Sequence, residues 1–242
     1  KKYFDLYPLE KIKLPKITEG DLQDVPPQGV KLSAARRNEF LNVKKHGKWK
    51  EGIRAYLASI SFADAQLGRL LDALEKSAHA DNVIIVFWSD HGWHLGEKNH
   101  WHKSTLWEEA TRIPFMISVP GVTQGATRCN RPVDTLCVYP TLIELCGLKP
   151  RKDLDGTSIV PLLKNPETTW VLPAVTEFKR GQCAVRSERF RYIRYSDGTE
   201  ELYDHSKDPN EWNNLAGKAS YRKDMDELGR SIPKKFAPDA PS

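Results

Sequence analysis

The sequence predicts an α/β fold, in which a large domain with a mixed or parallel sheet is followed by a small antiparallel subdomain. Three observations support this fold class. Apolar residues recur at helical spacing over residues 53–77, and a continuous, largely β-branched apolar run follows at residues 83–88. A second such run covers residues 114–119. Towards the C-terminus the pattern changes to short strands separated by polar turns.

The first unit is expected to span residues 1–168. Residues 1–50 are rich in Pro and Lys and only weakly periodic, so we expect an irregular surface segment there. Because residues 83–88 are apolar throughout, we expect a central parallel strand that is buried on both faces. The other elements expected in this unit are the helix at residues 53–77, a strand at residues 114–119 closed by Pro120 and Gly121, and a helix at residues 133–146 ended by Gly147.

The second unit is expected to span residues 169–242 as a small antiparallel sheet packed against the main layer. A polar helix and a Pro-rich end are expected after residue 216. The strands are predicted at residues 171–178, 183–187, 190–195 and 201–203, with a turn at residues 196–198 between the last two.

The composition excludes several classes of protein. With 242 residues, 39% of them hydrophobic and 29% charged, the chain is typical of a folded globular protein. Its longest apolar run is far shorter than the roughly 20 residues of a membrane-spanning helix. The net charge of +5 is local, since residues 1–50 hold 12 Lys and Arg against 6 Asp and Glu. A solvated surface segment explains this excess of basic residues. The sequence has no motif that indicates a nucleic-acid partner, and an anionic polysaccharide stays open as a partner.

The cysteines and the first residues say little about the cellular compartment. Four cysteines without a C-x-x-C pair do not form a disulfide framework. The chain opens on Lys1 and Lys2 without an initiator Met or the apolar stretch of a signal peptide. We therefore expect its start to be a boundary made by processing or cloning.

The segment directly after the first apolar strand carries the most chemistry. Residues 90–103 hold one Asp, one Glu, two Trp, two Lys and four of the seven His of the chain. Ligands of open α/β sheets bind outside the carboxyl ends of the strands, which is where Asp90 and His91 are expected to emerge. Gly92 permits a sharp turn after them. The sequence thus predicts a binding or catalytic loop.

Two other interpretations of this loop stay open from the residues alone. Asp90 could cap a following helix, with the His residues exposed in a plain loop. Zinc is the second alternative, because His91, His94, His100 and His102 are nitrogen donors. The glycines at positions 92 and 96 argue against a helix that presents two of these His residues on one face.

Several segments, in order along the chain, resemble the second half of type I sulfatases, most of all the iduronate-2-sulfatase branch. The match begins with Y-F-D-L-Y-P-L-E-K-I at residues 3–12 and the helix S-F-A-D-A-Q-L-G-R-L-L-D-A-L at residues 61–74. It continues with S-D-H-G-W-H-L-G-E-K-N-H-W-H-K at residues 89–103 and T-L-W-E-E-A-T-R-I-P-F-M-I-S-V-P-G at residues 105–121. Residues 201–216 resemble the C-terminal signature of these enzymes. The resemblance implies an alkaline-phosphatase-like fold.

The resemblance also implies roles for residues of the loop. Asp90 and His91 would be ligands of an active-site calcium ion, a hard cation that favours carboxylate oxygen, with His91 standing where many sulfatases have Asn. Lys103 would be catalytic, contacting a sulfate oxygen and offsetting charge on the leaving group. The neighbouring residues are expected to bind substrate: Trp93, His94, Glu97, His100, Trp101 and His102. Among these, His94, His100 and His102 depart from the pattern of the lysosomal enzyme of that branch.

One half of the expected active site is missing from the sequence. Sulfatases of this type carry a C-x-P-x-R or S-x-P-x-R motif whose first residue becomes formylglycine, preceded by an Asp pair that completes the calcium site. Ser118 and Ser231 begin this pattern, but Val122 and Lys235 stand in place of the Arg. The chain is therefore expected to be the C-terminal half of a sulfatase, with an N-terminal half of the same enzyme as its partner.

The function expected from the resemblance is hydrolysis of a sulfate ester on a sulfated carbohydrate, with Ca²⁺ and formylglycine as the required groups. The isolated chain is expected to be inactive. Two alternatives are a phosphate- or phosphonate-ester hydrolase of the same superfamily and a non-catalytic fragment or pseudoenzyme. By the habits of the family the enzyme is expected to be secreted, periplasmic or lysosomal.

Overall fold

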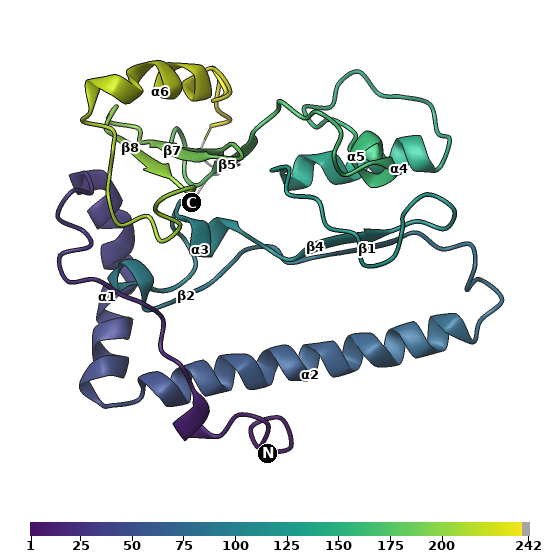
Figure 1. The fold of residues 1–242 in the computed structure, drawn as a ribbon, viewed down its shortest axis with the longest axis horizontal. Helices are drawn as coiled ribbons and strands as arrows, with labels where there is room; N and C mark the ends of the chain where they lie inside the picture. Colours follow the sequence, from purple (N-terminus) through teal and green to yellow (C-terminus); the bar gives the residue numbers. More distant parts are fainter. Residues whose placement is uncertain (239–242) are drawn as a thin grey trace.

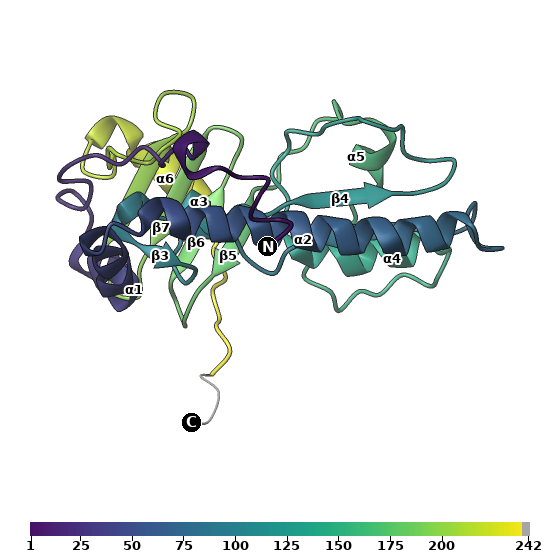
Figure 2. The same cartoon turned by 90° about the horizontal axis from the view of Figure 1, so that it is seen from below.

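The computed structural model describes residues 1–238, and for residues 35–37 it describes the backbone alone. Two groups of elements are joined along one side by the long helix α2 (Trp49–Glu75) (Figure 1). Seen from below, α2 passes in front of both groups (Figure 2). The first elements are the short helix η1 (Leu9–Lys11) and helix α1 (Pro27–Lys45), which lies at one end of α2.

Helix α1 corrects the expectation that residues 1–50 are irregular. Pro27 begins the helix, where its missing N–H costs nothing. The weak periodicity of this segment hides a helix that tertiary contacts stabilise. Phe40 is completely buried, and its ring lies 5.0 Å edge-on from Trp49 and 6.3 Å from the stacked ring of Trp101.

Helix α2 confirms the prediction of a helix over residues 53–77, with its start four residues earlier. Its first half packs into the core around Phe40 through Ile53 and Leu57. In its second half Leu70 and Leu71 are exposed. The apolar stripe that identified this helix in the sequence is therefore only partly covered within the chain.

Strands β1 (Ile85–Trp88) and β4 (Phe115–Ser118) lie at the positions predicted but not in the arrangement predicted. They pair with each other in antiparallel register, Ile85 opposite Ser118 and Trp88 opposite Phe115. The prediction of a central parallel strand buried on both faces is thus wrong for the described residues, where the side chains of β1 are half-buried or exposed. An apolar run indicates burial in the whole protein but not the direction of the neighbouring strand.

The four-stranded sheet near the C-terminus confirms the predicted antiparallel subdomain. Its order is β5 (Ala174–Glu177), β6 (Cys183–Arg186), β7 (Phe190–Arg194) and β8 (Glu200–Asp204), with every pair antiparallel. Helix α6 (Arg222–Gly229) covers one face, where Met225 joins the apolar cluster. The other face packs on Leu106 and Trp107 and on Leu32 of α1. A boundary at residue 169 stays a prediction, since this core is shared with earlier segments.

Three short helices lie between β4 and β5 in the sequence. The predicted helix at residues 133–146 is present as η3 (Thr135–Cys137) continued by α4 (Val138–Leu145), and α5 (Val160–Lys164) follows it. The short helix η4 (Ala219–Tyr221) precedes α6. All four cysteines are free. In residues 1–238 no helix is long and apolar enough to span a lipid bilayer.

Candidate active site

The predicted loop after β1 folds into a small, irregular hairpin. Strands β2 (His94–Leu95) and β3 (Trp101–His102) pair around the short helix η2 (Glu97–Asn99), and helix α3 (Glu108–Thr111) follows. Four residues without the freedom of glycine have positive φ here: Lys98, Asn99, His102 and Ser104. Such backbone conformations persist only where surrounding contacts hold them, and they are frequent at functional sites.

Asp90 and His91 directly follow the end of β1, as predicted. The Asp90 carboxylate is largely solvent-exposed, and its Oδ2 lies 3.3 Å from His91 Nε2. Nδ1 of His91 lies 2.8 Å from the carbonyl oxygen of Gly92. Because a carbonyl only accepts hydrogen bonds, Nδ1 carries a proton, so in the neutral ring the Nε2 lone pair faces Asp90. Two acceptor atoms this close need a proton or a cation between them.

Gly92 is required at the turn behind this pair. A Cβ at this position would lie 2.1 Å from the carbonyl oxygen of Glu109 and 2.7 Å from that of Arg112, so only glycine fits. Its N–H donates to the carbonyl of Ala110 at 2.8 Å. The Asp90–His91 segment is therefore held directly against α3.

Trp93 lies at the centre of a group of rings next to His91. Its ring stacks 5.8 Å from that of Tyr56 on α2 and 6.2 Å from the imidazole of His91. The imidazole of His102 meets it edge-on at 4.4 Å. The loop and the distant helix α2 thus form one aromatic surface near Asp90, and Tyr56 belongs to it although the sequence did not single it out.

His94 and His100 are both completely buried. Nε2 of His94 lies 2.7 Å from Thr105 Oγ1, and burial, together with the neighbouring His100, holds its pKa well below the usual value. His94 is therefore neutral at ordinary pH. Trp101 is also buried, in the core around Phe40. In this conformation the three rings are out of reach of a substrate, and the substrate contact predicted for them stays a prediction.

Lys103 is exposed, and the buried imidazole of His100 contacts its backbone carbonyl. Nδ1 of His100 lies 3.0 Å from the carbonyl of Ser33 on α1, and Nε2 lies 2.8 Å from the carbonyl of Lys103. The preceding residue, His102, is ion-paired with Glu39 at 2.5 Å. Helix α1 therefore positions the residue that we expected to contact sulfate.

Lys98 is a central residue of the loop that the sequence did not reveal. Its ammonium group is buried, donates to Asp21 Oδ1 at 2.7 Å and also donates to the carbonyl of Glu211. It lies 5.6 Å from the ring centre of Trp107 and 5.1 Å from that of Tyr203. Glu97, beside it, accepts a hydrogen bond from the Leu95 N–H, and burial raises its pKa.

The C-terminal signature supports the loop through two buried carboxylates. Glu201 accepts hydrogen bonds from Trp107 Nε1 at 2.8 Å and from the hydroxyls of Tyr195 and Tyr203. Glu211 accepts the N–H of Glu108 at 2.9 Å and pairs with Arg191. Both carboxylates therefore hold the segment that joins the loop to α3, which gives this signature a structural role.

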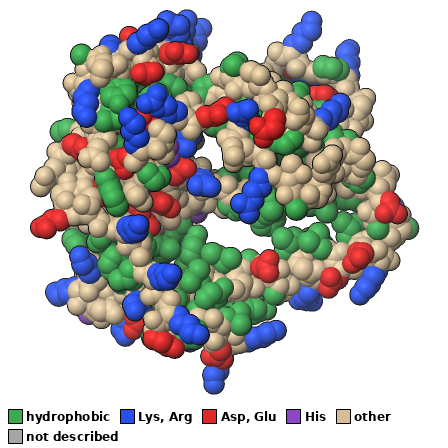
Figure 3. Space-filling view, viewed as in Figure 1, with side chains coloured by type: hydrophobic (Ala, Val, Ile, Leu, Met, Phe, Trp, Pro, Cys, Tyr) green, Lys and Arg blue, Asp and Glu red, His purple; other side chains and the backbone are tan. Residues whose placement is uncertain are grey.

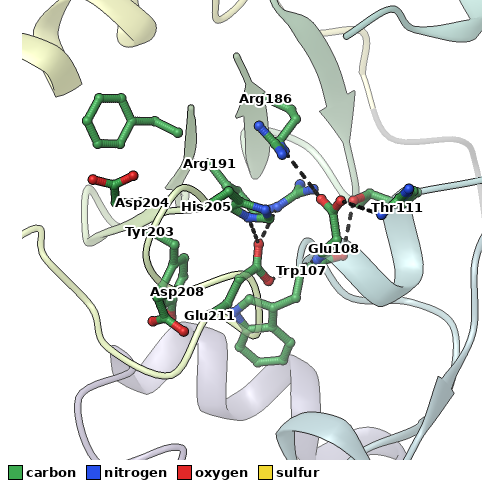
Figure 4. Close-up of polar contacts among 12 residues, drawn as sticks. Trp107, Glu108, Thr111, Arg186, Arg191, Tyr203, Asp204, His205, Asp208 and Glu211 are labelled. Atoms are coloured by element: carbon green, nitrogen blue, oxygen red, sulfur yellow. Dashed lines mark hydrogen bonds and ion pairs between the residues drawn. The ribbon is translucent and has the colours of Figure 1, made fainter. Parts of the chain in front are cut away.

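Glu108, His205 and Glu211 form a group that is compatible with metal binding by distance alone. Their ligand atoms all lie within 4.8 Å of one another. However, the guanidinium of Arg191 pairs with both Glu108 and Glu211, as Figure 4 shows. Burial opposes ionisation of Glu108, but Arg191 and Arg186 together hold its pKa below the usual value. The position of a cation is thus already filled by Arg191, and we assign no metal to this group.

Comparison with known proteins identifies the family. The sulfatase family profile matches residues 19–148, which is more than half of the chain. The chain belongs to the sulfatase family. A second profile, the C-terminal region of N-sulphoglucosamine sulphohydrolase, matches residues 96–236 of this sulfatase.

Individual sulfatases agree with the profiles. A sulfatase of Formosa agariphila is 42% identical over 96% of this chain and 46% of its own length. The N-acetylglucosamine-6-O-sulfatase of Bacteroides thetaiotaomicron is 34% identical over 75% of this chain and 35% of its own length. One solved structure shows a protein bound to its substrate, D-glucosamine-2-N,6-O-disulfate. That protein is 31% identical to this chain, with a TM-score of 0.65, and the match covers 76% of this chain and 40% of the other.

These matches confirm the expected alkaline-phosphatase-like fold. They also show that the chain spans less than half the length of these relatives.

Proposed function

We propose that this chain forms part of a sulfatase that hydrolyses sulfate esters of a sulfated carbohydrate. The observation that carries the proposal is the Asp90–His91 pair at the end of β1, two oriented ligand groups that face each other in a chain of this family. The proposal covers the whole enzyme, of which this chain supplies one part. The family match favours this reaction over phosphate- or phosphonate-ester hydrolysis and over a non-catalytic role.

Asp90 fits the calcium ion that the family resemblance implies, and the imidazole of His91 is a less typical ligand for this hard cation. Asp90 offers exposed carboxylate oxygens, and His91 is oriented by its Nδ1 contact with Gly92, in the way that outer contacts usually orient a metal-bound imidazole. A bound calcium ion would polarise the sulfate oxygens. Asp90 and His91 hold and orient the ion in this proposal, and the remaining ligands come from outside this chain.

Lys103 supplies a cation on the sulfate side of the site in this proposal. Its ammonium contacts a sulfate oxygen and offsets the charge that develops on the leaving oxygen. The His100 contact to its carbonyl and the positive φ of His102 and Ser104 on either side keep the backbone of Lys103 in one conformation.

The substrate proposed is a sulfated sugar that packs on the surface made by Trp93, Tyr56 and His102. Aromatic faces suit the apolar faces of sugar rings. Two relatives, named for N-acetylglucosamine-6-sulfate and for D-glucosamine-2-N,6-O-disulfate, support a sulfated amino sugar, whereas others are named for choline sulfate and for ulvan. The finer assignment, an iduronate-2-sulfatase-like specificity, stays a prediction, since these relatives carry other names.

The rest of the site is proposed to come from the remainder of the enzyme. No Cys or Ser here has the complete C-x-P-x-R or S-x-P-x-R motif, so the nucleophile, a formylglycine, would lie outside this chain. Apolar side chains line the opening between α2 and the β1–β4 pair (Figure 3). Leu70 on α2 and Met116 on β4 are 66% and 56% exposed, and we propose that the other half of the enzyme covers them. Secretion or a periplasmic or lysosomal location is proposed from the family.

The test is hydrolysis by the full-length enzyme of an aryl sulfate and of a 6-sulfated amino sugar, measured as sulfate released. Lys103→Ala is expected to lower kcat at least a hundredfold, worth about 2.7 kcal/mol of transition-state stabilisation. Asp90→Asn is expected to lower both activity and calcium binding, the latter measured by calorimetry. Lys152→Ala, an exposed lysine far from the loop, is the matched control. An unchanged kcat in Lys103→Ala, or no sulfate release by the wild type, would contradict the proposal.

A further inference from the structure

A dense group of basic side chains lies at the corner between α1 and α2. Residues 44–50 contain Lys44, Lys45, His46, Lys48 and Lys50, which we call the basic corner. All of these side chains are exposed except that of Lys50, which is half-buried. The one nearby carboxylate, Glu51, pairs with Lys48 at 3.0 Å. Basic side chains gather over this end of α2 at the lower left of Figure 3.

The backbone of the basic corner is well defined. Gly47 has a φ of 63° and ends α1, with Gly47 N–H donating to the carbonyl of Lys44 and Lys48 N–H to that of Val43 at 2.8 Å. This is the Schellman pattern of helix ends. Trp49, the next residue, is fixed edge-on against Phe40 at 5.0 Å. The lysines therefore project from a rigid turn rather than from a mobile loop.

The basic corner is joined on both sides to the candidate active-site loop. From α2, Trp49 Nε1 donates to the carbonyl of Leu95 at 2.6 Å. From α1, Glu39 pairs with His102, the residue before Lys103. An α-helix rises 1.5 Å per residue, so Lys44 lies about 8 Å along α1 from this ion pair. A chain of a few sugars is long enough to cover both places.

We infer that the basic corner binds the sulfate groups of a polysaccharide chain whose next ester occupies the candidate active site. This inference rests on the proposed function and extends it from a sulfated sugar to a sulfated polymer. Four lysines with one carboxylate among them repel one another, and an anionic polymer relieves that repulsion. Lysines at a helix C-terminus also stabilise the helix by interacting with its dipole. This effect accounts for Lys44 and Lys45, which lie at the end of α1, but not for Lys48 and Lys50.

The chemistry of the corner favours a polysaccharide over a nucleic acid. Single-stranded nucleic acids bind to basic surfaces that also offer aromatic faces for the bases. The indole of Trp49 is packed on Phe40 and its N–H donates to the carbonyl of Leu95, which leaves the small imidazole of His46 as the exposed ring of the corner. What remains is a set of separate point charges, which suits sulfate groups spaced along a sugar chain.

The experiment compares three variants of the full-length enzyme. The first is the triple variant Lys44→Ser, Lys45→Ser and Lys50→Ser. The second keeps the charge with Lys44→Arg, Lys45→Arg and Lys50→Arg. The matched control removes three lysines near α4 and α5, at the other end of the molecule in Figure 1, with Lys149→Ser, Lys152→Ser and Lys164→Ser. Binding to heparin and to desulfated heparin is measured at two salt concentrations, and hydrolysis of a small aryl sulfate is measured in parallel.

The serine triple variant is expected to bind heparin at least tenfold more weakly at low salt and to lose most of its salt dependence. The arginine variant and the matched control are expected to bind like the wild type, and all variants to hydrolyse the aryl sulfate equally. An equal loss in the matched control, binding that persists on desulfated heparin, or stronger binding to a DNA strand than to heparin would overturn the inference. If heparin binding depends on the lysines of the basic corner but the enzyme hydrolyses no sulfate ester, the proposed function is wrong and the inference about the binding surface is still supported.

Discussion

The ammonium group of Lys98 lies 2.7 Å from the carboxylate of Asp21, and the two side chains are only 2% and 3% exposed. This pair joins the candidate active-site loop to the segment before α1, 77 positions earlier in the chain. Burial raises the pKa of Asp21, and the nearby Lys98 opposes this shift. Because each charge is compensated by the other, loss of either one leaves a buried charge without a partner.

We therefore expect Lys98→Met to lower the free energy of unfolding by about 3–5 kcal/mol, since Asp21 would then be buried and uncompensated. Urea unfolding of the full-length enzyme measures this. In the double variant Lys98→Met, Asp21→Asn the uncompensated charge is removed, and about half of the loss should return. A loss below about 1 kcal/mol in the single variant would show that the pair does not anchor the loop.

A second prediction concerns Glu109 and pH. Burial, followed by the negative charges of Glu97, Glu211 and Glu108, raises the pKa of Glu109 to about 7. A carboxyl with a raised folded-state pKa stabilises the fold below its ordinary pKa of 4.5, and this contribution is lost as the pH rises to about 7. Glu109→Gln should therefore be more stable than the wild type at pH 8 and equally stable near pH 4.5.

The expected gain for Glu109→Gln at pH 8 is about 1 kcal/mol, because the side chain is partly exposed and solvent screens the repulsion. Thermal unfolding at the two pH values measures it. Glu188→Gln, an exposed carboxylate paired with Arg131, provides the control and should not be stabilised at pH 8. An equal effect of Glu109→Gln at both pH values would mean that titration of Glu109 is not the cause.

The third prediction concerns His100 as a positioning residue. His100→Phe keeps a ring in the core but removes the contacts to the carbonyls of Ser33 and Lys103. The buried carbonyl of Ser33 and the partly buried carbonyl of Lys103 then lose a partner, so stability should fall by about 1–3 kcal/mol. If His100 positions Lys103, kcat per folded molecule should also fall about tenfold on an aryl sulfate. His46→Phe, at an exposed histidine, is the control, and an unchanged kcat per folded molecule would leave His100 a purely structural role.

The sequence predicted the elements of this fold better than their pairing. The helical stripe of α2 and the four short strands of the C-terminal sheet follow directly from periodicity, because in them the side chains that face the core repeat at a fixed spacing. The apolar run of β1 gave the strand but not its antiparallel partner β4. Helix α1 was missed because it is stabilised by Phe40 against two Trp rings, which local periodicity does not record.

The candidate site shows the same division. Asp90, His91 and Lys103 were predicted from a resemblance in the motif at residues 89–103, and their catalytic roles stay predictions. The motif did not distinguish exposed residues such as Lys103 from buried ones such as His94, because both carry polar groups. Lys98 was missed for a related reason: nothing local to a lysine indicates that its partner is Asp21, far away in the sequence. Long-range partners of polar residues require the structure.

The last prediction concerns the apolar surface between α2 and the β1–β4 pair. In the described residues β1 and β4 pair only with each other, so each has an unpaired edge. Leu70 on α2 and Met116 on β4 are exposed. An unpaired strand edge next to exposed apolar side chains is a site of association. The isolated chain should therefore self-associate, as measured by size-exclusion chromatography with light scattering.

Lysines introduced at this surface should oppose association, both with a second copy of the isolated chain and with the other half of the full-length enzyme. Leu70→Lys with Met116→Lys is expected to shift the isolated chain towards the monomer and, in the full-length enzyme, to lower its stability. Val171→Lys, at an apolar residue that is 83% exposed elsewhere, should change neither property. If the isolated chain is monomeric, or if Val171→Lys has the same effect, the surface does not bind the other half. If only the two lysines at Leu70 and Met116 act, in both proteins, the association is specific to this surface, because loss of an apolar contact and burial of a charge occur only where another chain segment covers the substituted residue.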